Sequence, residues 1–483
     1  MPTRAQHPSV VERHGPPKPS RAGARALAVI VTCQLMVAVD GNIVNIALPR
    51  IQSGLGFSPD GLAWVFSAYA LAFGGLLLLG GRAGDLLGRR RTLVLGLLLV
   101  VAASLLGGLA PNAGALIAAR ALQGVGFAFA APAALSLIAV TFAEGPARTR
   151  ALGVFSTVAG LGITLGLVLG GLLAALSWRL VFFVNVPIGL AAVLLARRHL
   201  PETERHPGRP DLPGALASTA GTTALVYGLI HASSAGWTAP ATVTALLLGA
   251  VLLAAFVLVQ AGSAHPLVPL RLLARRDRSG AYAVFLLLFA AMGGTYVLLS
   301  LYVQDGLGLS PLTAGPAFLP LALAQFAAAR SAPGLLPRYG AKPLVVTGAA
   351  LLLADSLWLA ATGPGSGYWG GLFGPLLLMG AGLGLGFVPL NATVLSGLAP
   401  AETGAASGLL QAAQQVGLSL GVAVLVTGYG RAVHGSAHPA RAPLAHGLAT
   451  AVTAAAAFSA LAVLIALLTL ARPARRDRPG RRA

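Results

Sequence analysis

Long apolar runs are the feature that most constrains this sequence. Fourteen of them follow one another, each of roughly 18 residues or more, which is enough to cross a hydrocarbon core about 30 Å thick as one α-helix. With a mean hydropathy of +0.80 and 56% hydrophobic residues, a chain of 483 residues has too little polar surface for a water-soluble protein. The runs cover residues 26–49, 61–81, 92–111, 114–140, 150–174, 180–197, 213–231, 241–260, 279–302, 313–330, 343–362, 369–396, 404–428 and 446–471. We therefore expect an all-α membrane protein with 14 transmembrane helices.

Basic residues lie between these runs and predict the orientation of the chain. There are 33 Lys and Arg residues against 13 Asp and Glu residues. With the N-terminus in the cytoplasm, 28 of the basic residues fall in inner segments or at the inner ends of runs, and Arg120 alone lies in the interior of a run. This asymmetry follows the positive-inside rule, so we expect a multi-pass protein of the cell membrane with both termini in the cytoplasm. The positive charge is then a topology signal, and we expect no nucleic acid partner.

Few residues are suited to catalysis or metal binding. Cys33 is the only cysteine, so a disulfide framework and a thiolate metal cluster are excluded. His434, His438 and His446 share one predicted outer loop without a nearby carboxylate, which favours a solvated loop over a metal site. No Walker-type phosphate-binding motif occurs, and the apolar runs offer too few His, Ser, Asp and Glu residues at one depth for an enzyme. The first run is too long for a signal peptide and carries an aspartate, so we expect it to be retained, and we expect no cofactor.

A charged bridge, GRAGDLLGRRR, joins the second and third runs on the predicted inner side. Its arginines can act as topology anchors, but anchoring explains neither the glycine spacing nor the aspartate. Glycines let a helix end approach another backbone closely, and an acid beside them can hold a helix N-terminus in one conformation and release it in another. We therefore interpret the bridge as a conformational latch made by Gly81, Asp85, Gly88, Arg89 and Arg90.

Several stretches resemble motifs of one known family. GRAGDLLGRRR resembles motif A of the major facilitator superfamily, LIAARALQGVG (116–126) resembles motif B, and GITLGLVLGG (162–171) resembles the antiporter motif C. VDGNIVNIALPRI (39–51), SWRLVFFVNVPIG (177–189) and ETGAASGLLQAAQQVG (402–417) are similar to segments of its 14-spanner drug:proton antiporters. The resemblance covers about residues 25–430. It implies the major facilitator fold, two six-helix bundles with two inserted helices, and proton-coupled export of drugs.

The implied architecture divides the chain into five parts. They are a cytoplasmic segment (1–25), an N-terminal six-helix bundle (26–197), a linker with two inserted transmembrane helices (198–278), a C-terminal six-helix bundle (279–471) and a basic cytoplasmic tail (472–483). PGLLPRYGAKP (333–343) reads as a degenerate copy of the charged bridge, in which Gly340 stands 252 residues after Gly88. This copy favours two repeats over a single long bundle.

Three charged residues lie well inside the apolar runs, away from their ends: Asp40, Arg120 and Asp355. Each costs about 2.5 to 3.5 kcal/mol at the bilayer centre on insertion scales, so such groups are rarely without a role. The predicted depths of Asp40 and Arg120 differ by only about 5 Å. The resemblance implies that their helices line a central cavity, where the pair couples transport to protons. A purely structural ion pair is the alternative, and Asp355 is assigned equally to packing or to function.

Motif C places Gly162, Gly166 and Gly170, followed by Gly171, along one helix. Glycines at every fourth position give a smooth face on which any neighbouring helix can pack. The resemblance adds a partner, the facing bundle, and a reason, a close seam that keeps protons from leaking.

The substrate is predicted from the polar residues expected in the cavity. These are Gln34, Asn42, Asn45, Tyr69, Tyr296 and Asn391. Their neighbours are mostly apolar, which suits a small lipophilic molecule better than a sugar, and the resemblance indicates antibiotics. We expect this substrate, protons and the lipid bilayer as partners of a monomeric protein. The alternatives are an exporter of lipids, amino acids or siderophores, and a membrane sensor that does not transport.

Overall fold

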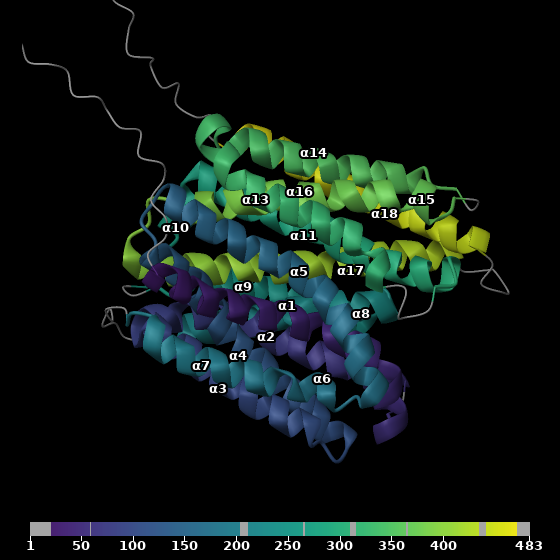
Figure 1. Ribbon diagram of the computed structural model, residues 1–483, viewed down its shortest axis with the longest axis horizontal. Helices are drawn as coiled ribbons and strands as arrows, with labels where there is room; N and C mark the ends of the chain where they lie inside the picture. Colours follow the sequence, from purple (N-terminus) through teal and green to yellow (C-terminus); the bar gives the residue numbers. More distant parts are fainter. Residues whose placement is uncertain are drawn as a thin grey trace, which may run out of the picture.

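Long helices make up almost all of the chain that the structure, a computed structural model, describes. The described residues are 21–57, 59–202, 211–263, 266–309, 315–363, 366–433 and 441–470. Within these ranges there are helices and no strand, and the long helices lie side by side (Figure 1). Eleven helices of this part are long and apolar enough to cross a membrane. The expectation of an all-helical membrane protein is confirmed.

The N-terminal bundle contains the first five long helices and a sixth that is broken near its start. These are α1 (Arg21–Leu55), α2 (Pro59–Leu87), α3 (Arg89–Gly108), α4 (Ala113–Thr141), α5 (Pro146–Leu176), the short α6 (Leu180–Phe183) and α7 (Asn185–His199). Helix α1 packs on α5, α2 packs on α4, and α3 packs on both α4 and α7. These pairings bury apolar side chains, aromatic rings such as Phe73 and Phe127 among them, in a core that continues into the second half of the chain.

The C-terminal bundle repeats the same pattern of neighbours. Its elements are α11 (Arg276–Leu301), a π-helical turn (Tyr302–Gly306), α13 (Leu319–Tyr339), α14 (Ala341–Ala360), α15 (Tyr368–Gly371), α16 (Phe373–Leu395), a 3₁₀ turn (Pro400–Glu402), α17 (Thr403–Val433) and α18 (Arg441–Thr469). Helix α11 packs on α17, α13 packs on α16, and α14 packs on both α16 and α18. Helices α11 to α18 therefore correspond in order to α1 to α7.

Two glycine pairs show this correspondence at the level of single residues. Gly88 and Gly340 have φ values of 95° and 78°, and each caps the helix that follows it, α3 or α14. Only glycine adopts such a conformation without strain. Gly96 and Gly348, also 252 residues apart, each face the backbone of a neighbouring helix, where an added Cβ would come within 2.6 Å of a carbonyl oxygen. The two charged bridges thus occupy equivalent positions.

Two further long helices, α8 (Leu212–Ala235) and α9 (Pro240–Gly262), connect the bundles together with the short α10 (Arg271–Ala274). Helix α8 packs on α2 and on α17, so it contacts both bundles, whereas α9 packs on α8. The ring of Tyr227 stacks on Trp64 of α2 at 6.4 Å, and Trp237 donates a hydrogen bond to Thr427 of α17 at 3.2 Å. The outward side of α9 exposes aliphatic side chains, as expected for a helix in contact with lipid.

Two helix pairs form the main seams between the bundles: α2 with α17, and α5 with α13. At the first seam, a Cβ added to Gly81 would lie 2.5 Å from the carbonyl oxygen of Gly404. At the second seam, the side chain of Gln325 occupies the space where a Cβ of Gly160 would be. Glycine is therefore required at the first seam, where the neighbouring atoms are backbone, whereas at the second seam a larger residue would displace the end of the flexible Gln325 side chain.

Candidate functional site

Asp40 of α1 lies in the interior of the N-terminal bundle and is completely buried. Its carboxylate forms an ion pair with Arg120 of α4 at 2.7 Å. It also accepts hydrogen bonds from the side-chain amides of Asn185 in α7 at 2.7 Å and Gln123 in α4 at 3.3 Å. Three helices therefore converge on one carboxylate, and the structure brings together the two residues that we predicted to be close.

Arg120 is held by several groups besides Asp40. Its Nε donates to the carbonyl oxygen of Val65 at 3.0 Å, and its Nη1 donates to Gln123 at 2.8 Å. The guanidinium lies 4.3 Å from the ring centroid of Tyr69, a cation–π contact. Its Nη2 is buried without a hydrogen-bond partner. A buried donor without a partner is energetically costly.

The surroundings of this pair differ from what we expected. The family resemblance implied that Asp40 and Arg120 line a central cavity, but both side chains are fully buried inside one bundle. Gln123 further donates to Ser104 of α3 at 2.8 Å, which extends the network away from the bundle interface. Sequence reasoning missed Gln123, Ser104 and Asn185 as partners, although Gln123 and Asn185 lie in two of the motifs that carried the resemblance.

Asp85, at the end of α2, joins the two bundles. Its carboxylate accepts hydrogen bonds from the backbone amides of Gly404 and Ala405 at 3.2 Å each, in the first turn of α17. The first amides of a helix have no partner within the helix and carry the positive end of its dipole, so they favour a carboxylate. Arg89 donates to the same carboxylate at 2.9 Å and also to the carbonyl oxygen of Pro400. The interaction predicted for the charged bridge is thus present.

Gly88 and Arg90 of the charged bridge make contacts within the N-terminal bundle. Gly88 makes the turn between α2 and α3 that brings Arg89 to Asp85. Arg90 instead pairs with Glu202, after the end of α7, at 3.2 Å. A second link between the bundles lies nearby, where Glu144 accepts a hydrogen bond from the backbone amide of Gly397 at 2.9 Å.

The motif C glycines do not face the other bundle, and this prediction was wrong. Cβ atoms added at Gly162, Gly166 and Gly170 would meet Ala38 Cβ at 2.5 Å, the Val39 carbonyl oxygen at 3.0 Å and the Ile43 carbonyl oxygen at 2.7 Å, all on α1. Two residues along an α-helix correspond to about 200° of rotation, so Gly162 and Gly160 lie on opposite sides of α5. The side with Gly160 meets α13 of the facing bundle. The motif C side packs within its own bundle.

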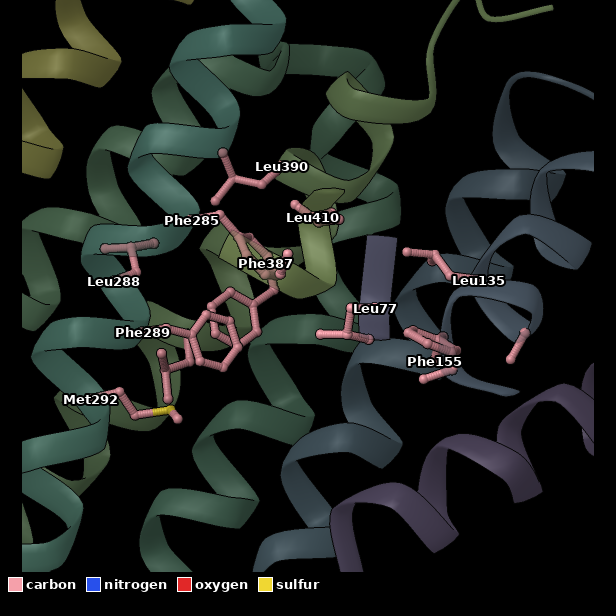
Figure 2. Close-up of a cluster of buried hydrophobic side chains, with 14 of the residues drawn as sticks. Leu77, Leu135, Phe155, Phe285, Leu288, Phe289, Met292, Phe387, Leu390 and Leu410 are labelled. Atoms are coloured by element: carbon pink, nitrogen blue, oxygen red, sulfur yellow. The ribbon is translucent and has the colours of Figure 1, made fainter. Parts of the chain in front are cut away.

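A small chamber of about 30 Å³ lies at the interface of the two bundles. Its lining residues are Gln34, Leu135, Phe155, Ser156, Ala159, Phe285, Phe289, Phe387, Asn391, Leu410, Gln411 and Gln414. Figure 2 shows the rings of Phe285, Phe289 and Phe387 turned toward one another beside this interface. A space of this size holds about one water molecule, so the bundles must separate before a larger ligand can enter.

Only two of the six predicted cavity residues line this chamber, Gln34 and Asn391. Asn42 bonds to the carbonyl oxygen of Ala38 on its own helix, and Tyr69 packs under Arg120. Tyr296 packs on Phe318 at 5.1 Å. The side chain of Asn45 lies outside the described residues. The glutamines of α17 were missed as cavity residues, although their clustering in an apolar run was a visible signal.

Asp355 of α14 is buried, and its Oδ1 has no hydrogen-bond partner. Helix α14 packs on α16 and α18 and lies away from both seams between the bundles. Of the histidines of the predicted outer loop, His434 and His438 lie outside the described residues. In the part of the chain that is described, no group of three or more His, Cys, Asp and Glu residues could hold a metal ion.

Comparison with known proteins extends these observations. Residues 30–422 match the family profile of the Major Facilitator Superfamily. The cephamycin export protein of Amycolatopsis lactamdurans is 41% identical over 417 residues, which cover 85% of this chain and 86% of that protein. The puromycin resistance protein of Streptomyces alboniger is 44% identical over 408 residues, covering 83% and 80%. The crystal structure of the human organic anion transporter MFSD10 shares the fold, with a TM-score of 0.66 at 20% identity, covering 92% of this chain and 100% of that one.

Proposed function

Because this chain belongs to the Major Facilitator Superfamily, we propose that it is a secondary transporter that exports lipophilic small molecules, antibiotics and other drugs among them, in exchange for protons. It is a multi-pass membrane protein, and its relatives are named for antibiotic export and resistance. The family resemblance drawn from the motifs is confirmed. The family and these relatives are transporters rather than enzymes.

The observation that carries the proton-coupling part is the environment of Asp40. Its carboxylate is fully buried and is held by Arg120, Asn185 and Gln123, so the contact with Arg120 depends on the charge of Asp40. When Asp40 takes up a proton, the ion pair is lost and Arg120 must find other acceptors. Since these residues stand on α1, α4 and α7, protonation changes the forces between helices of one bundle. We propose this as the step by which protons drive the conformational change.

The charged bridge provides the conformational step. We propose that Asp85 holds the N-terminus of α17 while the inner side is closed, and releases it when the inner side opens. Arg89 keeps the carboxylate oriented in the closed form. Gly81 and Gly404 permit the close approach of the two helices at that point. Alternating access then requires breaking a small number of charge-assisted hydrogen bonds, which suits a contact that must form and break in each cycle.

The topology proposed for this function has 14 transmembrane helices. Helices α5, α8 and α13 complete the set with the eleven apolar helices found by length and composition. We propose bundles at residues 26–197 and 279–471, joined by a linker at 198–278, in a monomer of the plasma membrane. Segments 1–25 and 472–483 are cytoplasmic in this arrangement, because the basic residues of the chain then lie on the inner side.

The electrical driving force alone is sufficient for useful export. One charge that moves down about 100 mV releases about 2.3 kcal/mol, and a tenfold gradient costs about 1.4 kcal/mol. One proton per substrate therefore supports a gradient of roughly fiftyfold before any pH difference is added.

The proposed function is tested by reconstituting the protein in liposomes that contain a pH-sensitive dye. A pH gradient is imposed and a panel of lipophilic antibiotics, puromycin included, is added. We expect proton movement that depends on the added compound. If no compound of the panel moves protons while the protein is folded and inserted, the proposal of proton-coupled drug export is wrong.

A further inference from the structure

The chamber between the bundles combines an aromatic wall with unpaired polar groups. The rings of Phe289 and Phe387 are stacked at 4.7 Å with an angle of 6° between their planes, and Phe285 lies 4.9 Å and 5.2 Å from them (Figure 2). All three rings belong to the C-terminal bundle, on α11 and α16. Rings arranged in this way offer a flat apolar surface to a further aromatic group.

Polar atoms of the N-terminal bundle complete the chamber. Gln34 of α1 and Ser156 of α5 both line it, and their side chains are buried, with 7% and 4% of the residue exposed. The Oε1 of Gln34 and the Oγ of Ser156 have no hydrogen-bond partner. Buried polar atoms without partners are uncommon in a folded protein, because each has lost its bonds to water without replacement. These two atoms are available to a ligand that carries its own donors and acceptors.

Charge is the property that the chamber lacks. None of the described residues that line it is ionisable. Asp40 lies six residues after Gln34, about 9 Å farther along α1, but its carboxylate is enclosed within the bundle by its own partners. A cation in the chamber would therefore lose its water without meeting a counter-charge, which is strongly unfavourable.

We infer that this chamber, once the bundles separate and widen it, binds substrates in their uncharged form, as aromatic molecules with hydrogen-bonding groups, so that their exchange for protons carries net charge across the membrane. The inference rests on the proposed function and narrows it to one substrate class. Phe289 and Phe387 stack on the substrate, and Gln34 and Ser156 bond to its polar groups. Since the substrate itself carries no charge, every proton exchanged for it moves one positive charge inward, and the membrane potential drives export even without a pH difference.

The inference is tested with two planar aromatic dyes in proteoliposomes, Nile red, which is uncharged, and ethidium, which is permanently cationic. We expect the wild-type protein to export Nile red at least about tenfold faster than ethidium, because an unpaired buried charge is so costly. With pH held equal on both sides, a valinomycin–potassium potential that is negative on the side holding Nile red should accelerate its export.

Matched variants show whether the chamber is responsible. Gln414→Glu adds a carboxylate to the lining, and we expect the Nile red to ethidium ratio to fall at least about tenfold. Gln415→Glu makes the same change on the next residue of α17, which packs toward Gly74 outside the chamber and should leave the ratio unchanged. Phe289→Leu should slow Nile red export, whereas Phe326→Leu on the exposed side of α13 should not.

The possible results separate the two claims. The inference is overturned if the wild-type protein exports ethidium as fast as Nile red, or if the rate of Nile red export does not change with the membrane potential. The proposal of drug export stands in both cases. The inference is equally overturned if the antibiotic panel is transported and Nile red is not. If neither the panel nor either dye is transported by folded protein, the proposed function itself is wrong.

Discussion

The backbone amide of Gly404 donates a hydrogen bond to the carboxylate of Asp85 at 3.2 Å, across 319 positions of the sequence and from one bundle to the other. The adjacent amide of Ala405 makes the same bond to the second carboxylate oxygen. A single aspartate thus satisfies two amides at the start of α17, which would otherwise lack acceptors. This contact between the bundles depends on the charge of Asp85 and on the lack of a side chain at Gly404, which lets the two helices approach closely.

Replacing Asp85 with asparagine should slow the transport cycle. Asparagine keeps one acceptor oxygen but loses the charge that attracts the helix N-terminus and Arg89. We expect turnover to fall about tenfold while the KM for substrate changes less than about twofold, as a lost interaction of about 1.4 kcal/mol implies. The measurement is the rate of substrate export at saturating and limiting concentrations. The control is Asp277→Asn, which breaks an ion pair with Arg275, two residues away, and not a contact between the bundles. Unaltered turnover in Asp85→Asn would refute the latch.

Adding a methyl group at Gly404 should block the same contact by its size. A Cβ there would collide with the carbonyl oxygen of Gly81 and lie 2.5 Å from Asp85 Oδ1. Because the clash exists only when the bundles meet, we expect Gly404→Ala to fold and insert but to lose more than about 90% of export. Gly430→Ala on the same helix, where nothing lies within 4 Å of the added Cβ, should retain full export. Equal activities in the two variants would show that closure at Gly404 is not needed.

Truncating Arg120 should cost more stability than removing the whole ion pair. Arg120→Ala leaves the Asp40 carboxylate buried without its cation, and breaking a buried pair in this way costs about 3 to 5 kcal/mol. The double variant Asp40→Asn with Arg120→Gln removes both charges, so its melting temperature in detergent should recover most of the loss. Melting temperatures that fall further in the double variant would contradict this account, because the two charges would then contribute independently.

The packing partner of motif C can be tested by a compensating pair of substitutions. Gly162→Ala would place its Cβ 2.5 Å from the Cβ of Ala38 on α1, so we expect a loss of about 1 to 3 kcal/mol of stability from overpacking. Ala38→Gly removes the colliding atom, and the double variant should regain the melting temperature of the wild type. Rescue indicates that α1 is the partner. If Ala38→Gly gives no rescue, the glycines pack elsewhere.

The positions of many helices could be predicted because the thickness of the bilayer fixes the length of the apolar run that a membrane-spanning helix needs. The runs at 92–111 and 343–362 correspond to α3 (Arg89–Gly108) and α14 (Ala341–Ala360), with ends that differ by two to three residues. The closeness of Asp40 and Arg120 followed from their similar depths together with the family resemblance, which implied that their helices line the same cavity. That Asp85 would hold a helix N-terminus followed from the affinity of an acid for such an end, and the structure identifies that helix as α17.

The choice among packing partners could not be predicted in the same way. The glycines at positions 162, 166 and 170 indicate that another helix packs closely on that side of α5, but their spacing does not identify the helix. Both sides of α5 carry small residues, so either could have faced the other bundle. The cavity residues failed for a similar reason. Tyr69 is polar and central in its run, yet its ring packs against the guanidinium of Arg120. The sequence could not show this, because a helix side that faces a buried guanidinium and one that faces a cavity have similar compositions.

The central claim, that Asp40 couples transport to protons, is tested most directly by comparing wild-type protein with Asp40→Asn in liposomes that hold a pH-sensitive dye. Two assays use an antibiotic that the wild-type protein transports. The first measures the proton movement that the antibiotic causes, and the second measures the exchange of labelled for unlabelled antibiotic across the membrane without a gradient. The account predicts that Asp40→Asn keeps the exchange but loses compound-dependent proton movement, since asparagine keeps the size of the side chain and one acceptor oxygen and takes up no proton. Proton movement in Asp40→Asn at the wild-type rate would contradict the claim and leave the buried ion pair with a structural role alone.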